Sequence, residues 1–146
     1  MKIIPIVSST IENIKSIDEP VQRINGVLKI ALLDLNHTTK GLHTATMPLG
    51  IGLLAAYLLE NLPKGSLEIK LYKFTEDIVA DLENKVDIVG FSMYSWNASL
   101  NRFFAERIKH RNPTALVVCG GPDITYKDDW IRSYLTRYAF VNFMVP

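Results

Sequence analysis

Apolar and polar positions follow two different periods from residue 27 onward, and the two periods alternate along the chain. Continuous or alternating apolar runs, which are typical of strands, occur at 27–35, 67–74, 86–92, 115–121 and 140–145. Apolar positions three or four residues apart, which are typical of helices, occur between those runs at 48–62, 76–84, 98–111 and 128–138. The pattern therefore predicts the order β-α-β-α-β-α-β-α-β.

Local residue choices agree with these elements. Pro48 opens the first helix, where the missing N–H of proline leaves no bond unmade. Residues 63–65 end that helix with a proline and a glycine. The helix at 98–111 is amphipathic, and we expect its buried face to be made of Leu100, Phe103, Phe104, Arg107 and Ile108.

Alternating strands and helices of this length need right-handed crossovers, which make the strands parallel and place helices on both faces of the sheet. We therefore expect an α/β domain with a flavodoxin-like (Rossmann-like), doubly wound, five-stranded parallel sheet of order 2-1-3-4-5. Ligands of such sheets bind outside the carboxyl ends of the strands, at the switch point between strands 1 and 3.

Residues 1–26 differ in pattern and are interpreted as an N-terminal extension of a domain at 27–146. The stretch 3–7 could be a short strand or an extended arm. Ile11, Ile14 and Ile17 have a helix-like spacing of three. The extension could cover the ligand site or contact a neighbouring domain.

Charge and composition disfavour several classes of partner. The formal net charge is +1, so we expect neither nucleic acid nor an anionic membrane surface to be bound. No stretch reaches the roughly 18 uninterrupted apolar residues of a membrane span. The single cysteine, Cys119, allows no disulfide within the chain and is interpreted as a buried strand residue. These features favour a cytoplasmic protein.

The loops after strands 1, 3 and 4 are chemically unusual. Hydroxyl and amide groups stand beside two large aromatic rings in the loop at 92–97, which suits a flat ligand with polar edges. Glycines after strand 4 and early in the first helix would let a ligand approach the backbone. The candidate contacts are Asn36, His37, Thr38, Thr39, Leu49, Gly50, Ser92, Met93, Tyr94, Ser95, Trp96, Asn97, Gly120, Gly121 and Pro122.

Each of these loops also has a purely structural interpretation. His37 could ligate a metal or an anionic group, or it could be a solvated loop histidine. Asn97 could do no more than cap the helix at 98–111, while Tyr94 and Trp96 pack at the sheet edge. The glycine pair also suits any tight turn from a strand into a helix.

Several known sites are excluded by their motifs. The chain has neither a GxGxxG fingerprint after strand 1 nor a GxxxxGK[ST] phosphate loop. A phosphoacceptor receiver would need an aspartate at the end of strand 3, where the chain has Gly90, Phe91 and Ser92. No nucleophile, base and orienting group can be assembled, so the pattern does not predict a catalytic activity for the chain alone.

Three stretches read PLGIGLLAAYL at 48–58, DIVGFSMYSWN at 87–97 and VVCGGPDI at 117–124. Together they resemble the N-terminal cobalamin (B12)-binding domain of B12-dependent radical SAM enzymes. The resemblance covers about residues 27–146, and it implies a corrin ring over the carboxyl ends of the strands with its nucleotide tail entering between the loops. Ser92 and the glycine pair at 120–121 match the tail-lining positions, whereas residues 36–39 and 94–97 would approach the corrin.

Methionine-synthase-like relatives of this family carry an Asp-x-His-x-x-Gly motif whose histidine ligates cobalt. Residues 34–41 of this chain read DLNHTTKG, with wider spacing at both steps. His37 is therefore a candidate lower ligand of cobalt whose spacing departs from that motif. The radical SAM branch, which often lacks a histidine ligand, fits the chain better.

The same family continues into a radical SAM barrel with a CxxxCxxC motif for a 4Fe-4S cluster and S-adenosylmethionine. One cysteine cannot hold that cluster. We therefore expect a truncated chain or a stand-alone module that binds cobalamin, and we expect the cluster, S-adenosylmethionine and the barrel as a partner only in a longer parent chain.

Two alternatives remain open at this point. The domain could be a flavodoxin-like signalling or protein-interaction domain without a cofactor, or a small enzyme or nucleotide binder that uses the same crevice. Both alternatives predict a shallow crevice in which Tyr94 and Trp96 are packing residues. The cobalamin hypothesis predicts a deep apolar slot between strands 1 and 3.

Overall fold

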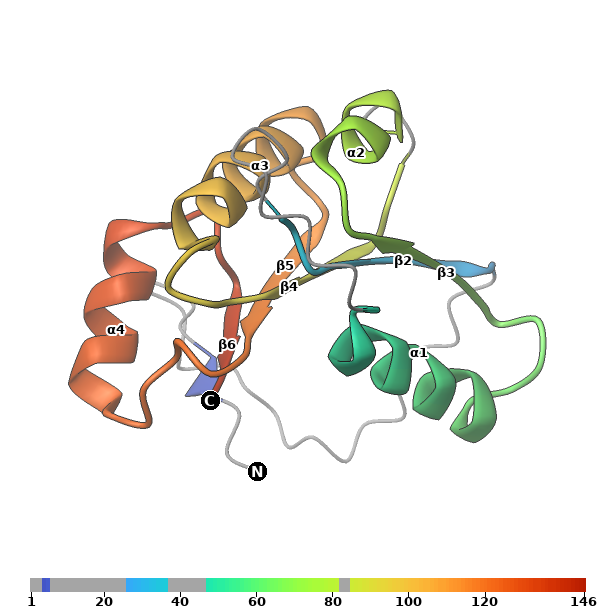
Figure 1. Ribbon diagram of the computed structural model, residues 1–146, viewed down its shortest axis with the longest axis horizontal. Helices are drawn as coiled ribbons and strands as arrows, with labels where there is room; N and C mark the ends of the chain where they lie inside the picture. The colour runs from blue at the N-terminus through green and yellow to red at the C-terminus, as the bar shows by residue number, and fades with distance from the viewer. Residues whose placement is uncertain (1–3, 6–25, 37–46, 82–84) are drawn as a thin grey trace.

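A computed structural model describes residues 4–5, 26–36, 47–81 and 85–146 (Figure 1). Its strands are β1 (Ile4–Pro5), β2 (Leu28–Leu33), β3 (Leu67–Tyr72), β4 (Ile88–Ser92), β5 (Leu116–Gly120) and β6 (Phe143–Val145). Its helices are α1 (Leu49–Asn61), α2 (Thr75–Asp81), α3 (Ala98–Arg111) and α4 (Asp128–Arg137). Every strand and helix predicted between residues 27 and 146 is present, with several ends shorter than expected.

The sheet has the strand order β1-β6-β5-β4-β2-β3. Strands β2 to β6 pair in parallel, so the predicted five-stranded, doubly wound sheet of order 2-1-3-4-5 is confirmed. Strand β1 adds a short antiparallel edge, in which Ile4 lies opposite Met144 and Pro5 opposite Phe143. This part of the N-terminal extension is therefore a strand, while the helix-like stretch at 9–17 lies outside the described residues.

The helices are divided unequally between the two faces of the sheet. Figure 1 shows α1 on the opposite side from α2 and α3. Side chains of α2, α3 and α4 share one large buried cluster with the strands, which includes Val89, Val117 and Met144. Helix α1 contributes Ile51 and Ala55 to a separate, much smaller cluster on the other face. The core of the molecule therefore lies mainly beneath α2, α3 and α4.

The buried face of α3 differs from the expected one. Its buried residues include Asn101, Phe104, Ala105 and Ile108, which repeat every three or four positions. Phe103 is 53% exposed, and the guanidinium of Arg107 lies 5.7 Å from the centre of its ring. The prediction that Phe103 and Arg107 belong to the buried face was wrong, because Asn101 and Ala105 occupy buried positions of the helix instead.

The turn after β5 brings its backbone very close to the end of β4. Gly121 has φ +120°, and a Cβ at this position would lie 2.8 Å from both the backbone N and the O of Met93. Met93 donates its N–H to the carbonyl of Gly120, and Asp123 donates its own to the carbonyl of Met93. The glycine at position 121 is therefore required by this close approach.

Candidate functional site

An open hollow of about 330 Å³ lies where β2, β3 and β4 end and α1 begins. Strands β2 and β4 are the neighbours at which the strand order reverses, so the hollow lies at the predicted switch point. We call it the switch-point hollow. It is lined by Asp34, Asn36, Met47, Pro48, Leu49, Gly50, Lys73, Tyr94 and Trp96.

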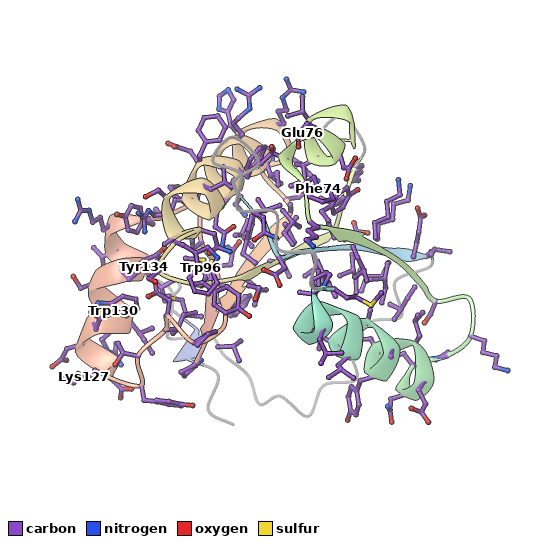
Figure 2. The ribbon with its side chains drawn as sticks, in the orientation of Figure 1. Phe74, Glu76, Trp96, Lys127, Trp130 and Tyr134 are labelled. Atoms are coloured by element: carbon purple, nitrogen blue, oxygen red, sulfur yellow. The ribbon has the colours of Figure 1, made fainter. Side chains whose placement is uncertain are left out.

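Two aromatic rings form one wall of the switch-point hollow. The rings of Tyr94 and Trp96 are stacked, with their centres 4.4 Å apart and their planes 15° from parallel. Trp96 lies in the turn between β4 and α3 and is 61% exposed (Figure 2). A large aromatic side chain that is so exposed adds little to the core, and the exposed part of its ring is suited to packing against a flat ligand.

The start of α1 forms another, mainly apolar part of the lining. The first helical hydrogen bond runs from the N–H of Gly52 to the carbonyl of Pro48, so Pro48 is at the N-cap. Met47 and Leu49 are both largely exposed. A Cβ added at Gly50 would meet nothing within 4 Å, so packing within the described residues does not require glycine there. Space beside Gly50 is therefore available to a ligand.

Polar groups stand at the ends of β2 and β3. The N–H of Asp34 donates to the carbonyl of Tyr72, and that of Asn36 to the carbonyl of Lys73, which continues the β2–β3 ladder into the hollow. Burial raises the pKa of the Asp34 carboxyl, and the nearby Lys73 ammonium partly offsets this. The hollow is therefore open and combines an acid, a base and an amide with apolar and aromatic walls, whereas the cobalamin hypothesis predicted a deep apolar slot.

Asn97 is fully buried behind the aromatic wall. Its Oδ1 accepts the N–H of Tyr94 at 2.9 Å, and its Nδ2 donates to the carbonyls of Leu35 at 3.2 Å and Ser92 at 3.1 Å. Asn97 occupies the N-cap position of α3, yet its side chain makes no capping hydrogen bond to that helix. The side-chain amide of Asn97 therefore forms hydrogen bonds to backbone groups around the hollow.

The other predicted residues in the described part of the chain do not line the switch-point hollow. Met93 belongs to the large core cluster, and Ser95 is exposed in the turn before α3. Ser92 and Gly120 are partners in the β4–β5 ladder. Because side chains alternate along a strand, Ser92 is on the same face as Ile88, which packs against the α1 cluster.

Gly121 and Pro122 follow in the turn after β5, which packs on the backbone of Met93. The structure thus brings Asn36, Leu49, Gly50, Tyr94 and Trp96 together among the predicted residues. His37, Thr38 and Thr39 lie outside the described residues.

Sequence reasoning missed four residues of the lining, namely Asp34, Met47, Pro48 and Lys73. The rule that ligands meet the carboxyl ends of strands would have found Lys73, because it directly follows a strand that neighbours β2. Asp34 ends strand 1 by the same rule. Met47 and Pro48 could have been found only from the way α1 begins over the sheet.

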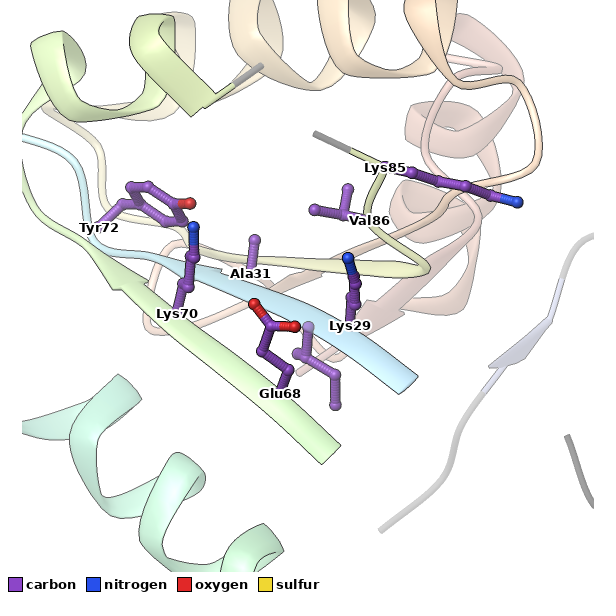
Figure 3. A pocket seen from close by; sticks show the side chains of 8 residues that line it. Lys29, Ala31, Glu68, Lys70, Tyr72, Lys85 and Val86 are labelled. Carbon is purple, nitrogen blue, oxygen red and sulfur yellow. The ribbon is translucent and has the colours of Figure 1, made fainter. Parts of the chain in front are cut away.

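A smaller hollow of about 80 Å³ lies on the sheet face beneath α2 (Figure 3). The exposed side chains of Lys29, Glu68 and Lys70 border it, together with Lys85 and Tyr72. Its charges are mixed, and it lies along the middle of β2 and β3 rather than at their carboxyl ends. The switch-point hollow is therefore the better candidate for a ligand site.

Neither a metal centre nor a reactive thiol is found in the described part of the chain. It contains no group of three or more His, Cys, Asp or Glu side chains that could hold a metal ion. His37, the candidate cobalt ligand, is outside that part. Burial raises the pKa of the Cys119 thiol to about 12, although Arg102 acts in the opposite direction. The thiol is therefore protonated at neutral pH and is not a nucleophile.

Comparison with models of known protein families gave no match, and comparison with curated proteins gave none either. Among the described residues, no helix is both long and apolar enough to span a membrane. The resemblance to B12-binding domains therefore stays a prediction that rests on the three sequence stretches.

Proposed function

We propose that the chain is a cobalamin-binding domain of the kind found at the N-terminus of B12-dependent radical SAM enzymes. The observation that carries this proposal is the position of the switch-point hollow. It lies at the reversal of strand order and is flanked by an exposed, stacked aromatic pair. Open α/β sheets bind their ligands at this place.

The residues around the hollow fit the chemistry of cobalamin. A corrin ring is broad and flat, with an apolar surface and amide groups around its edge. Tyr94, Trp96 and Leu49 offer apolar area, while Asn36, Asp34 and Lys73 offer polar groups at the rim. The hollow is smaller than cobalamin, so it would hold only part of the cofactor and leave the rest for other residues to cover.

In this proposal the nucleotide tail lies on the sheet face beside α1. Ser92 and Gly120 are neighbours across β4 and β5, and Gly90 is on the same face of β4 two residues earlier. These side chains are small or absent. A Cβ at Gly120 would meet only ordinary contacts at 3.5 Å or more, whereas one at Gly90 would lie 2.9 Å from Cδ2 of Leu32, so the tail would run beside Ser92 and Gly120. This strip is on the same face as α1 and is continuous with the end of β4 that leads into the hollow.

In this proposal the chain itself binds and orients the cofactor. Bound cobalamin would supply methyl-group transfer or help a radical rearrangement in a longer parent enzyme. The described residues place no histidine in the hollow, since His110 belongs to the last turn of α3. His37, the candidate cobalt ligand, follows the lining residue Asn36 and lies outside the described residues.

The proposal is tested by titrating the purified chain with hydroxocobalamin and following the visible spectrum, then by gel filtration. We expect colour to be retained at about one equivalent. In Trp96→Ala we expect the affinity to fall roughly three- to tenfold, because a stacking surface is lost. Trp130→Ala, which removes the other tryptophan from α4, is the control and should bind as the unaltered chain does. Absence of retained colour in the unaltered chain would contradict the proposal.

A second candidate function, a protein-interaction domain without a cofactor, is supported by the surface of α1. Leu53, Tyr57 and Leu59 are more than half exposed on this helix, which contains one charged residue, Glu60. Apolar area of this kind is typical of a contact surface. The candidate predicts no retained cobalamin, and it predicts that Leu53→Glu with Tyr57→Glu abolishes association with other protein molecules in sedimentation experiments.

A further inference from the structure

We propose that Asn97 is a positioning residue that sets the width of the switch-point hollow. It does so by tying the loop after β2 to the turn after β4, which form two neighbouring parts of the lining. The effect on ligand binding rests on the proposed function, whereas the effect on the aromatic wall does not.

The first hydrogen bond fixes the segment that follows β2. Nδ2 of Asn97 donates to the carbonyl of Leu35 at 3.2 Å. Leu35 stands between Asp34 and Asn36, and both of these residues line the hollow. Leu35 itself is fully buried. A fixed carbonyl at this position therefore limits how far the two flanking side chains can move away from β4.

The second tie holds the aromatic wall. Oδ1 of Asn97 accepts the N–H of Tyr94 at 2.9 Å, and the backbone N–H of Asn97 donates to the carbonyl of Tyr94 at 3.1 Å. These bonds close the turn that carries Trp96. Because the two rings are stacked, fixing the backbone of Tyr94 also restricts the position of the Trp96 ring.

A second buried amide supports the first. Nδ2 of Asn101 lies 3.0 Å from both Oδ1 of Asn97 and the carbonyl of Ser92. Asn97 and Asn101 are the buried polar side chains of the described residues. Burying an amide is costly unless its hydrogen bonds are made. Both polar atoms of the Asn97 side chain are bonded, whereas Oδ1 of Asn101 has no partner among the described residues, so Asn97 is the better satisfied of the two.

Capping of α3 does not explain this arrangement. An N-cap asparagine normally accepts an N–H from the first turn of its own helix, but the side chain of Asn97 makes no such bond. Its backbone partners are Leu35, Ser92 and Tyr94, which belong to the two segments around the hollow, and its partner in α3 is the side-chain amide of Asn101. The side chain therefore joins these segments and makes no bond to the backbone N–H groups at the start of the helix.

The test compares Asn97→Ala with Asn112→Ala. Nδ2 of Asn112 donates to the carbonyl of Val86 at 2.6 Å, so this control also removes an amide that holds a backbone carbonyl. Val86 precedes β4, at the end of the sheet away from the switch-point hollow. Both variants are made with Trp130→Phe, which leaves Trp96 as the single tryptophan of the chain.

The readouts are the near-ultraviolet circular dichroism of Trp96, hydroxocobalamin affinity and stability in urea. We expect Asn97→Ala to reduce the Trp96 signal and to weaken cobalamin binding on the order of tenfold, because preorganisation of the hollow is lost. Asn112→Ala should lower the urea midpoint while leaving the Trp96 signal and the affinity unchanged. An unchanged Trp96 signal in Asn97→Ala, or an equal change in both variants, would overturn the inference.

Two further outcomes are distinguishable. If the unaltered chain binds no cobalamin, the proposed function fails, and the Trp96 signal alone still tests the role of Asn97. If Asn97→Ala does not fold, Asn97→Asp replaces it and is measured at a pH high enough to ionise its buried carboxyl, because the carboxylate keeps an acceptor for Tyr94 but cannot donate to Leu35. Faster hydrogen exchange at the Asn36 amide is then expected, and unchanged exchange there would refute the tie to β2.

Discussion

At the scale of single residues, the meeting of Gly121 with the backbone of Met93 gives the sharpest prediction. Gly121→Ala adds a Cβ 2.8 Å from Met93 N and O at φ +120°, whereas Gly120→Ala adds one no nearer than 3.5 Å to Val145 O. We expect Gly121→Ala to lower the free energy of unfolding by about 2 kcal/mol or more, and Gly120→Ala by much less. Urea titration of both variants checks this, and equal losses would contradict it.

The sequence allowed Tyr94 and Trp96 to be predicted as site residues, but it did not show what Asn97, Asp34 and Lys73 do there. Tyr94 and Trp96 follow a strongly apolar strand in a fold whose ligands meet strand ends, so their position could be inferred. The direction of the Asn97 side chain could not be inferred, because an asparagine before a helix usually caps it. Asp34 and Lys73 are far apart in the chain, and they meet only because β2 and β3 pair.

At the scale of elements, α1 holds to the sheet through a narrow contact. Ile51 and Ala55 are its buried residues, and they pack against Ile30 and Leu32 of β2. We expect Ile51→Ala to destabilise the fold by about 2–4 kcal/mol, because the deleted groups are buried and a cavity remains. Leu53→Ala, at a position that is 61% exposed, should cost less than about 1 kcal/mol.

Thermal or urea unfolding of these two variants provides the measurement for α1. A similar cost at both positions would mean that the exposed side of α1 is covered in solution. The sequence predicted α1 as a helix but did not show which side of it faces the sheet. Most of its positions are apolar, so no single stripe in the sequence marked the side that meets the sheet.

At the scale of the whole molecule, the two faces of the sheet differ in packing. One buried cluster joins α2, α3 and α4 to the strands, and the other contains four buried residues around α1. Segments with few buried contacts open at lower free energy than the rest of a protein. We therefore expect amide hydrogens of α1 to exchange faster than those of α3. Hydrogen exchange followed by mass spectrometry measures this, and equal protection would speak against two unequal layers.

The strand order followed from the alternation of elements, because parallel crossovers of one hand leave few arrangements. Strand β1 could not be placed in the same way. It pairs over two residues, Ile4 and Pro5, and such a short pairing leaves no periodic pattern in the sequence.

The two edges of the sheet have a consequence for self-association. On one side the edge strand is β1, where Pro5 has no N–H to offer to another chain. On the other side the edge strand is β3, which carries the exposed charges of Glu68 and Lys70. A strand from another chain would therefore meet a very short edge at β1 and a charged edge at β3. Growth into β-rich aggregates by edge-to-edge pairing is therefore disfavoured at both ends of the sheet.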